Sequence, residues 1–211
     1  GNALFQGTAS GYVKALKEHF DMPFAHDVRV GGAACQKYRP DVFPDIIMDK
    51  YNRQFFENLI ETSQTPNMLF YGPPGTGKTT TIINFIRLFQ ERNEGHYDKS
   101  MIMHLNASDD RGVEVIRNQI QQFVSTKPFF SNGVKFVILD EADYMTKNAQ
   151  LALHKLIQTS CHHSTKVCIC LICNYISKIE SYLQNEFIHI RFNTLDNVNI
   201  LQFLTNILVK E

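Results

Sequence analysis

The sequence has no excess of charge of either sign, because its 21 Lys and Arg residues balance its 21 Asp and Glu residues. A protein coated in basic surface is therefore excluded, and any contact with nucleic acid would have to be a local patch. No apolar run approaches the ~20 residues that cross a bilayer, which argues against a membrane span. Internal repeats, low-complexity tracts and long charge runs are also absent. The 211 residues, 44% of them hydrophobic, are instead sufficient for one soluble domain with a sizeable core, or for one domain and a fragment of a second.

Cysteine is scarce, with five residues, and its pattern matches a metal site only weakly. Cys170 and Cys173 have a C-x-x-C spacing, and a Cys-His-His triplet lies nearby at residues 161–163. A second pair with this spacing is missing, and Cys168 and Cys170 lie inside an apolar run that is typical of a buried strand. We therefore expect reduced core thiols and no zinc site, which suits a cytosolic or nuclear protein.

From Lys37 onward, apolar runs alternate with helical patterns, and this alternation predicts an α/β fold with a parallel sheet. The predicted strands are Asn67–Tyr71, Met101–Leu105, Val134–Leu139, Val167–Ile172 and Phe187–Phe192. The predicted helices are Lys78–Arg92, Gly112–Val124, Lys147–Thr159, Lys178–Gln184 and Asn197–Lys210.

A phosphate-binding loop follows the first predicted strand. Its sequence, Gly-Pro-Pro-Gly-Thr-Gly-Lys-Thr, matches G-x-x-x-x-G-K-[ST] in full and opens a predicted helix. Glycines let the backbone turn so that several N–H groups point at one anion, and the helix N-terminus adds its positive end. Lys78 is predicted to reach the β- and γ-phosphates of ATP, and the Thr79 hydroxyl to bind Mg²⁺. The predicted nucleotide-binding residues here are Gly72, Pro73, Pro74, Gly75, Thr76, Gly77, Lys78, Thr79 and Thr80.

Polar residues also end two later strands. Asp140 and Glu141 end the third predicted strand, and strand alternation is expected to direct them to different sides. Asp140 would then hold the water shell of Mg²⁺, as a metal-binding and nucleotide-binding residue, while Glu141 orients or deprotonates the attacking water. Asn174 follows the fourth predicted strand. It fits a catalytic group that senses the γ-phosphate, although an Asn after a strand is more often a turn residue.

Several ordered segments resemble one family. Lys37–Pro40, Leu69–Thr80, Leu105–Gly112 and Ile138–Asp143 are similar, in order and spacing, to segments of the small subunits of replication factor C, the AAA+ clamp loader. The stretch Phe123–Phe130 most resembles the subunit called the fifth in the human nomenclature. The resemblance implies an AAA+ P-loop domain with a five-stranded parallel sheet in the order 5-1-4-3-2, flanked by helices.

The resemblance also implies a domain organisation. Residues 37–195 would form the AAA+ ATPase domain, and residues 196–211 the first helix of a truncated lid. A complete subunit would continue into the lid and a helical collar, so we expect the chain to be part of a longer protein. Residues 1–36 stay unassigned, and their first seven residues look like a protease recognition stretch left by a tag.

The function implied by the resemblance is ATP hydrolysis with Mg²⁺ that loads a sliding clamp onto primer-template DNA. The partners would be the other subunits of a hetero-pentamer, the clamp and DNA, with no membrane, in the nucleus. Arg111, Arg117 and Asn118 would lie near DNA phosphates, although ordinary solvated helix residues are the alternative. Phe129 and Phe130 would contact the clamp, with core burial as a nearly equal alternative. The adenine pocket would be lined by Lys37, Tyr38, Arg39, Pro40, Ile46 and Ile47.

Four positions depart from the family pattern. Glu186 stands where the family carries an Arg that acts in trans on the neighbouring subunit's nucleotide. An Arg pair is replaced by His154 and Lys155, and the usual acid on the same helix is Gln158. Two other readings therefore stay open. One is a AAA+ motor such as a branch-migration helicase, and the other is a scaffold that binds ATP without hydrolysing it.

Overall fold

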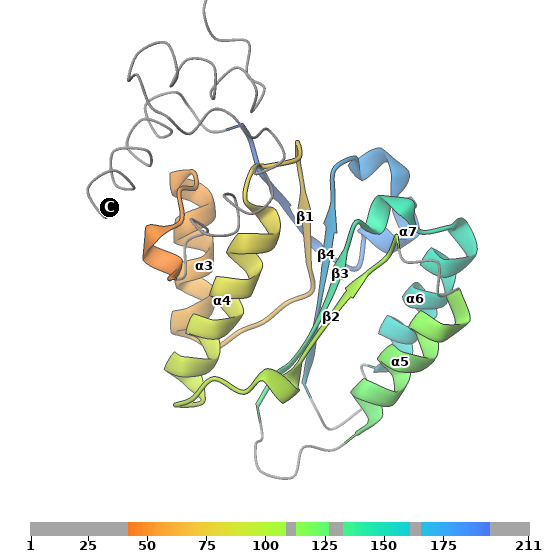
Figure 1. The fold of residues 1–211 in the computed structure, drawn as a ribbon, viewed down its shortest axis with the longest axis horizontal. Helices are drawn as coiled ribbons and strands as arrows, with labels where there is room; N and C mark the ends of the chain where they lie inside the picture. The colour runs from red at the N-terminus through yellow and green to blue at the C-terminus, as the bar shows by residue number, and fades with distance from the viewer. Residues whose placement is uncertain (1–41, 109–112, 127–132, 161–165, 195–211) are drawn as a thin grey trace, which may run out of the picture. The chain divides into compact units, whose positions relative to one another are not determined.

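The computed structural model describes residues 42–108, 113–126, 133–160 and 166–194, and within them a five-stranded sheet lies between two layers of helices (Figure 1). All neighbouring strands pair in parallel, in the order β2-β3-β4-β1-β5. This confirms the predicted order 5-1-4-3-2, counted from the other edge. The strands are β1 (Met68–Tyr71), β2 (Ile102–Asn106), β3 (Lys135–Asp140), β4 (Val167–Cys173) and β5 (Ile188–Arg191).

The middle of the sheet is apolar on both faces. Every residue of β3 except Asp140 is buried, and every residue of β4 except Val167. Parallel strands covered on both faces form such continuous apolar runs. The burial of Cys168 and Cys170 in β4 agrees with the strand predicted there. At the edge of the sheet, β5 buries only Ile190.

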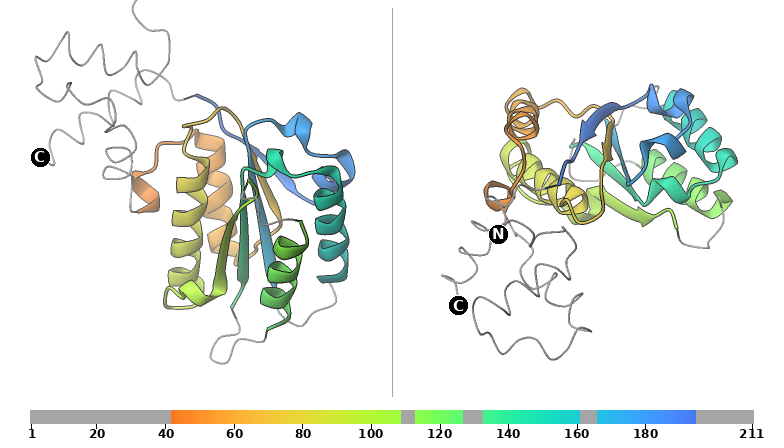
Figure 2. Two further views of the ribbon diagram at one scale, coloured as in Figure 1. Left: turned by 45° about the vertical axis from the view of Figure 1, so that its right-hand side comes forward. Right: turned by 90° about the horizontal axis from the view of Figure 1, so that it is seen from above.

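Helices cover both faces of the sheet (Figures 1 and 2). On one face, α3 and α4 pack over a core rich in phenylalanine, in which the rings of Phe56 and Phe85 have centroids 5.1 Å apart. On the other face, α5, α6 and α7 pack over a mostly aliphatic core. The helices are α3 (Lys50–Thr62), α4 (Lys78–Asn93), α5 (Val113–Ser125), α6 (Lys147–Ser160) and α7 (Ser181–Gln184). None of the described helices is long and apolar enough to cross a membrane.

Helix α3 was not among the predicted helices, although its signals are local. The side chain of Asp49 caps its start by accepting hydrogen bonds from the backbone N–H groups of Tyr51 and Asn52. Phe56 and Leu59, three residues apart, are its buried residues. An N-cap followed by apolar residues at helical spacing is a readable helix signal.

The helix predicted over Lys178–Gln184 is wrong in its extent. The segment contains instead the end of a 3-10 turn, η6 (Ile176–Lys178), and the short α7. Ile179 and Glu180 between them are extended, with ψ angles of 127° and 142°. The further 3-10 turns are η3 (Phe43–Asp45), η4 (Lys99–Met101) and η5 (Ala142–Tyr144). The predicted lid helix, the tag remnant and the rest of residues 1–36 lie outside the described residues.

Candidate nucleotide-binding site

The loop between β1 and α4 has the backbone that its glycines allow. Gly72, Gly75 and Gly77 have φ angles of 145°, 77° and 88°, values that side-chain-bearing residues rarely adopt. A Cβ atom on Gly72 would lie only 2.0 Å from the carbonyl oxygen of Phe192. Gly77 is the N-cap of α4, so the loop leads directly to the positive end of that helix. This is the geometry predicted for a phosphate-binding loop.

Lys78 lies buried at the start of α4, with its ammonium turned toward oxygen atoms of the site. Its Nζ donates to the carbonyls of Gly72 and Pro73, both at 2.8 Å, and to Oδ1 of Asn174 at 3.0 Å. Burial lowers the pKa of Lys78. The nearby Cys173, Asp140 and Asp143 act to raise this pKa, but they offset the effect of burial only in part. The ammonium is therefore held by neutral oxygens, and a phosphate would supply the counter-charge that they lack.

Thr79 and Asp140 meet across the site. The hydroxyl of Thr79 donates to Oδ2 of Asp140 at 2.9 Å, and the backbone N–H of Glu141 donates to Oδ1 at 2.9 Å. Nε2 of His104 on β2 lies 3.7 Å from Oδ2. Burial acts to raise the pKa of Asp140, but the nearby His104 and the hydrogen bonds from Thr79 and Glu141 outweigh it and lower this pKa below its ordinary value. An ionised carboxylate beside a hydroxyl is a set of hard oxygen donors that fits Mg²⁺.

The chain turns at Glu141, which corrects the expectation that strand alternation would direct Asp140 and Glu141 to different sides. β3 ends at Asp140, and Glu141 has φ 55° and ψ 37° in the left-handed region. Such a conformation is uncommon in a residue with a side chain and is frequent at functional sites. The half-buried Glu141 thus lies at the carboxyl edge of the sheet, directly after Asp140.

Asp143, His104 and Gln150 belong to this region, but sequence reasoning did not single them out. Asp143 is buried, and its Oδ1 accepts a 3.4 Å hydrogen bond from the backbone N–H of Asn174. It therefore links the turn after β3 to the end of β4. Asp143 could have been selected because it lies in Ile138–Asp143, a segment that carries the family resemblance. His104 could not be selected from the sequence as a site residue, because a His within an apolar strand is not distinctive.

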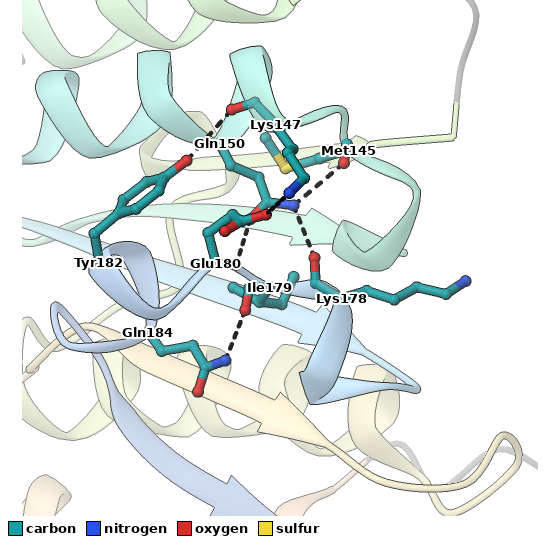
Figure 3. Close-up of polar contacts among 8 residues, drawn as sticks. All are labelled: Met145, Lys147, Gln150, Lys178, Ile179, Glu180, Tyr182 and Gln184. Atoms are coloured by element: carbon teal, nitrogen blue, oxygen red, sulfur yellow. Dashed lines mark hydrogen bonds and ion pairs between the residues drawn. The ribbon is translucent and has the colours of Figure 1, made fainter.

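Gln150 on α6 connects the two segments that follow β3 and β4 (Figure 3). Its side chain is only 1% exposed. Nε2 donates to the carbonyls of Met145 at 3.2 Å and Lys178 at 3.0 Å, and Oε1 accepts from the backbone N–H of Glu180 at 2.8 Å. These bonds account for the extended backbone where a continuous helix was predicted. The side chain of Glu180 forms a 3.0 Å ion pair with Lys147, which is exposed at the surface.

Replacing Gln150 by leucine is expected to destabilise the fold by about 2–3 kcal/mol, because three partly buried backbone groups lose their hydrogen bonds to it. Urea unfolding would measure this change. The matched control is Gln54→Leu on the exposed face of α3, which should change the free energy of unfolding by less than about 0.5 kcal/mol. Equal effects of the two substitutions would contradict the bridging role of Gln150.

The departures from the family pattern lie together in space. Nε2 of His154 on α6 is 3.1 Å from Oε1 of Glu186, and Nε2 of Gln158 is 3.2 Å from the same His154 nitrogen. The His154 ring also lies edge-on to Tyr182, with centroids 5.3 Å apart. Glu186 is therefore held against α6 by His154. Both residues depart from the family pattern. Lys155 on the same helix is exposed.

Several predicted site residues lie elsewhere or outside the described residues. Ile46 is buried in the core beside α3 and α4, and Ile47 is half-buried. Asn118 is exposed on α5. Arg117 belongs to α5, but its side chain is outside the described part of the chain. Also outside the described residues are Lys37, Tyr38, Arg39, Pro40, Arg111, Phe129, Phe130, Cys161, His162 and His163.

Comparisons with known proteins agree with this fold and with the family resemblance. Residues 68–194 match the family described as "ATPase family associated with various cellular activities (AAA)". Replication factor C subunit 3 of Schizosaccharomyces pombe is 40% identical over 176 residues, which cover 83% of this chain and 49% of that protein. Replication factor C subunit 5 of Homo sapiens is 43% identical over 161 residues, which cover 76% of this chain and 45% of that protein. The chain thus spans about half the length of the curated relatives it matches.

Solved structures share the fold at low sequence identity. An ORC1 protein of Aeropyrum pernix in complex with DNA has a TM-score of 0.62 at 18% identity, over 82% of this chain and 52% of that chain. The RuvB Holliday junction branch migration motor of Thermotoga maritima has a TM-score of 0.60 at 15% identity, over 80% of this chain and 53% of that chain. These likenesses concern the fold alone. The chain belongs to the AAA ATPase family, and its predicted resemblance to replication factor C small subunits, subunit 5 among them, is confirmed.

Proposed function

We propose that this chain binds and hydrolyses ATP with Mg²⁺, and that it does so as a replication factor C small subunit that helps to load a sliding clamp onto primer-template DNA. The observation that carries the proposal is the convergence of Lys78, Thr79, Asp140 and Asn174 on one glycine loop, with bonds of 2.8 to 3.0 Å. The relatives that are about 40% identical supply the clamp-loader context. Nuclear localisation stays a prediction.

Each polar group of the site has a chemical role in this proposal. The glycine loop and the start of α4 bind the phosphates, and Lys78 exchanges its carbonyl partners for phosphate oxygens. Thr79 and Asp140 hold Mg²⁺, which when bound neutralises charge on the phosphates. Glu141 orients and deprotonates the attacking water. Asn174, already bonded to the Lys78 ammonium, reports whether a γ-phosphate has replaced that contact.

The proposed partners are the other subunits of a hetero-pentamer, the clamp and DNA. The exposed Asn118 on α5 is available for a phosphate contact, and Arg111 and Arg117 are proposed to contact DNA phosphates as well. A chain with no net charge would hold DNA through such a local patch, repeated around a ring.

The test is ATP turnover in a reconstituted complex of this chain with the other subunits. Clamp and primer-template DNA should together stimulate turnover, and labelled clamp should become retained on DNA only when ATP is present. If clamp retention is the same when this chain carries Glu141→Gln, ATP hydrolysis at its site is not required for loading.

A scaffold that binds ATP only to hold an assembly together is the second candidate. Glu186 lends it partial support, whereas the intact Glu141 speaks against it. A trans Arg is worth about 10³–10⁵ in rate, whereas a carboxylate repels the same phosphate oxygens. Arg191 cannot readily replace it, because it lies in β5. We therefore propose that the neighbouring site facing Glu186 is slow or takes its Arg from elsewhere, while this chain's own site is competent.

Substituting Glu186→Ala is expected to leave the turnover of the complex unchanged or raise it, and Glu186→Arg to raise it further. Steady-state ATPase assays of the reconstituted complex would measure both. His154→Ala is the matched control, since it breaks the same contact but keeps the carboxylate. Loss of turnover in Glu186→Ala would show a positive role for this carboxylate and would require a new alignment of the segment.

A further inference from the structure

Two exposed tyrosines flank one lysine beside the candidate site. Nζ of Lys178 lies 5.3 Å from the ring centroid of Tyr144 and 5.4 Å from that of Tyr175. The rings are largely open to solvent, since Tyr144 is 63% exposed and Tyr175 is 60% exposed. Exposed aromatic groups gathered at one place mark a binding surface more often than scattered ones do. These three residues are called the tyrosine–lysine cluster below.

The cluster is built on the segments that carry Glu141 and Asn174. Tyr144 ends η5, which directly follows Glu141, and Tyr175 directly follows Asn174. The carbonyl of Lys178 is held by Gln150, and its side chain runs away from that bond (Figure 3). A ligand bound to the cluster would therefore act on both segments of the candidate nucleotide site.

The charge of the cluster favours an anion. Among the residues that the structure describes, no carboxylate forms an ion pair with Lys178. Glu180, two residues further on, is neutralised by Lys147 at 3.0 Å. The Lys178 ammonium contacts two ring faces, and it keeps N–H donors that an anionic oxygen can accept.

We propose that the tyrosine–lysine cluster binds an unpaired nucleotide of single-stranded nucleic acid. A base stacks on one tyrosine ring while its phosphate contacts the Lys178 ammonium, the combination by which single strands are held without sequence preference. A protein partner fits less well, because lysine is depleted at protein–protein interfaces, whereas the Lys178 ammonium lies at the centre of this cluster. This inference rests on the proposed function and extends it, since it names a place for an unpaired stretch of the DNA partner.

The chain contains no tryptophan, so tyrosine fluorescence can report stacking directly. A fluorescently labelled oligothymidine strand would be titrated with the full chain at low salt, with anisotropy and tyrosine quenching measured together. The double variant Tyr144→Leu/Tyr175→Leu should bind about fivefold more weakly or worse and lose part of the quenching. Lys178→Gln should reduce the salt slope of binding by about one.

Tyr97 is the matched control, because it is 41% exposed and Arg87 lies over its ring at 5.7 Å. Tyr97→Leu should bind the strand as the wild type does. The inference is overturned if the double variant matches the wild type, if the wild type does not bind the strand, or if an acidic peptide displaces it at equal concentration. A fluorescent ATP analogue, titrated in parallel, tests the proposed function separately, because the double variant keeps Lys78.

Discussion

Replacing Lys78 by alanine is expected to weaken ATP binding by about 100-fold or more. The ammonium is the main cation in reach of the phosphates, and charge-assisted hydrogen bonds are among the strongest in proteins. Burial lowers the pKa of Lys78, and the oxygens that hold its ammonium are neutral, so a phosphate would supply the missing counter-charge. Titration with a fluorescent ATP analogue would measure the loss.

The control for Lys78 is Lys155→Ala, which removes an exposed lysine on α6 and should leave ATP affinity unchanged. Thermal unfolding of both variants would verify that they are folded, since Lys78 also holds Gly72, Pro73 and Asn174. Equal ATP affinity of Lys78→Ala and the wild type would overturn the assignment of the phosphate loop.

Replacing Glu141 by glutamine is expected to preserve ATP binding and to slow hydrolysis by about 10²–10⁴-fold, the usual contribution of a general base. The amide has the same shape but does not accept a proton from water. The left-handed backbone at Glu141 should tolerate glutamine as it tolerates glutamate, so the fold is not expected to change. Single-turnover hydrolysis in the reconstituted complex would separate the chemical step from product release.

The control for Glu141 is Glu91→Gln, which neutralises an exposed carboxylate paired with Arg87 on α4. It should change neither binding nor hydrolysis. If Glu141→Gln hydrolyses ATP at the wild-type rate, the water is activated by another group. In that case the role of Glu141 would be only to form the turn after β3.

The elements that could be predicted from the sequence are those whose pattern lies within a short stretch of neighbouring residues. The strands were found within one or two residues of their ends, because buried parallel strands form short apolar runs. The loop over residues 72–79 was found because phosphate binding needs glycines and a lysine at fixed spacing, and the structure gives those glycines positive φ angles. Asp140 and Asn174 were found because parallel strands bring their carboxyl ends to one edge.

Only the tertiary structure decided how distant residues meet. In it, the Lys78 ammonium donates a hydrogen bond to Asn174, and His154 contacts Glu186. Gln150 bonds to backbone groups in the segment where a continuous helix was predicted. These contacts join residues 28 to 96 positions apart along the chain. Periodicity reports only which face of an element is apolar, over the few residues that share a turn or a pleat. Which buried polar groups become partners depends on how the packed elements place them, and that is fixed only when the whole core is assembled.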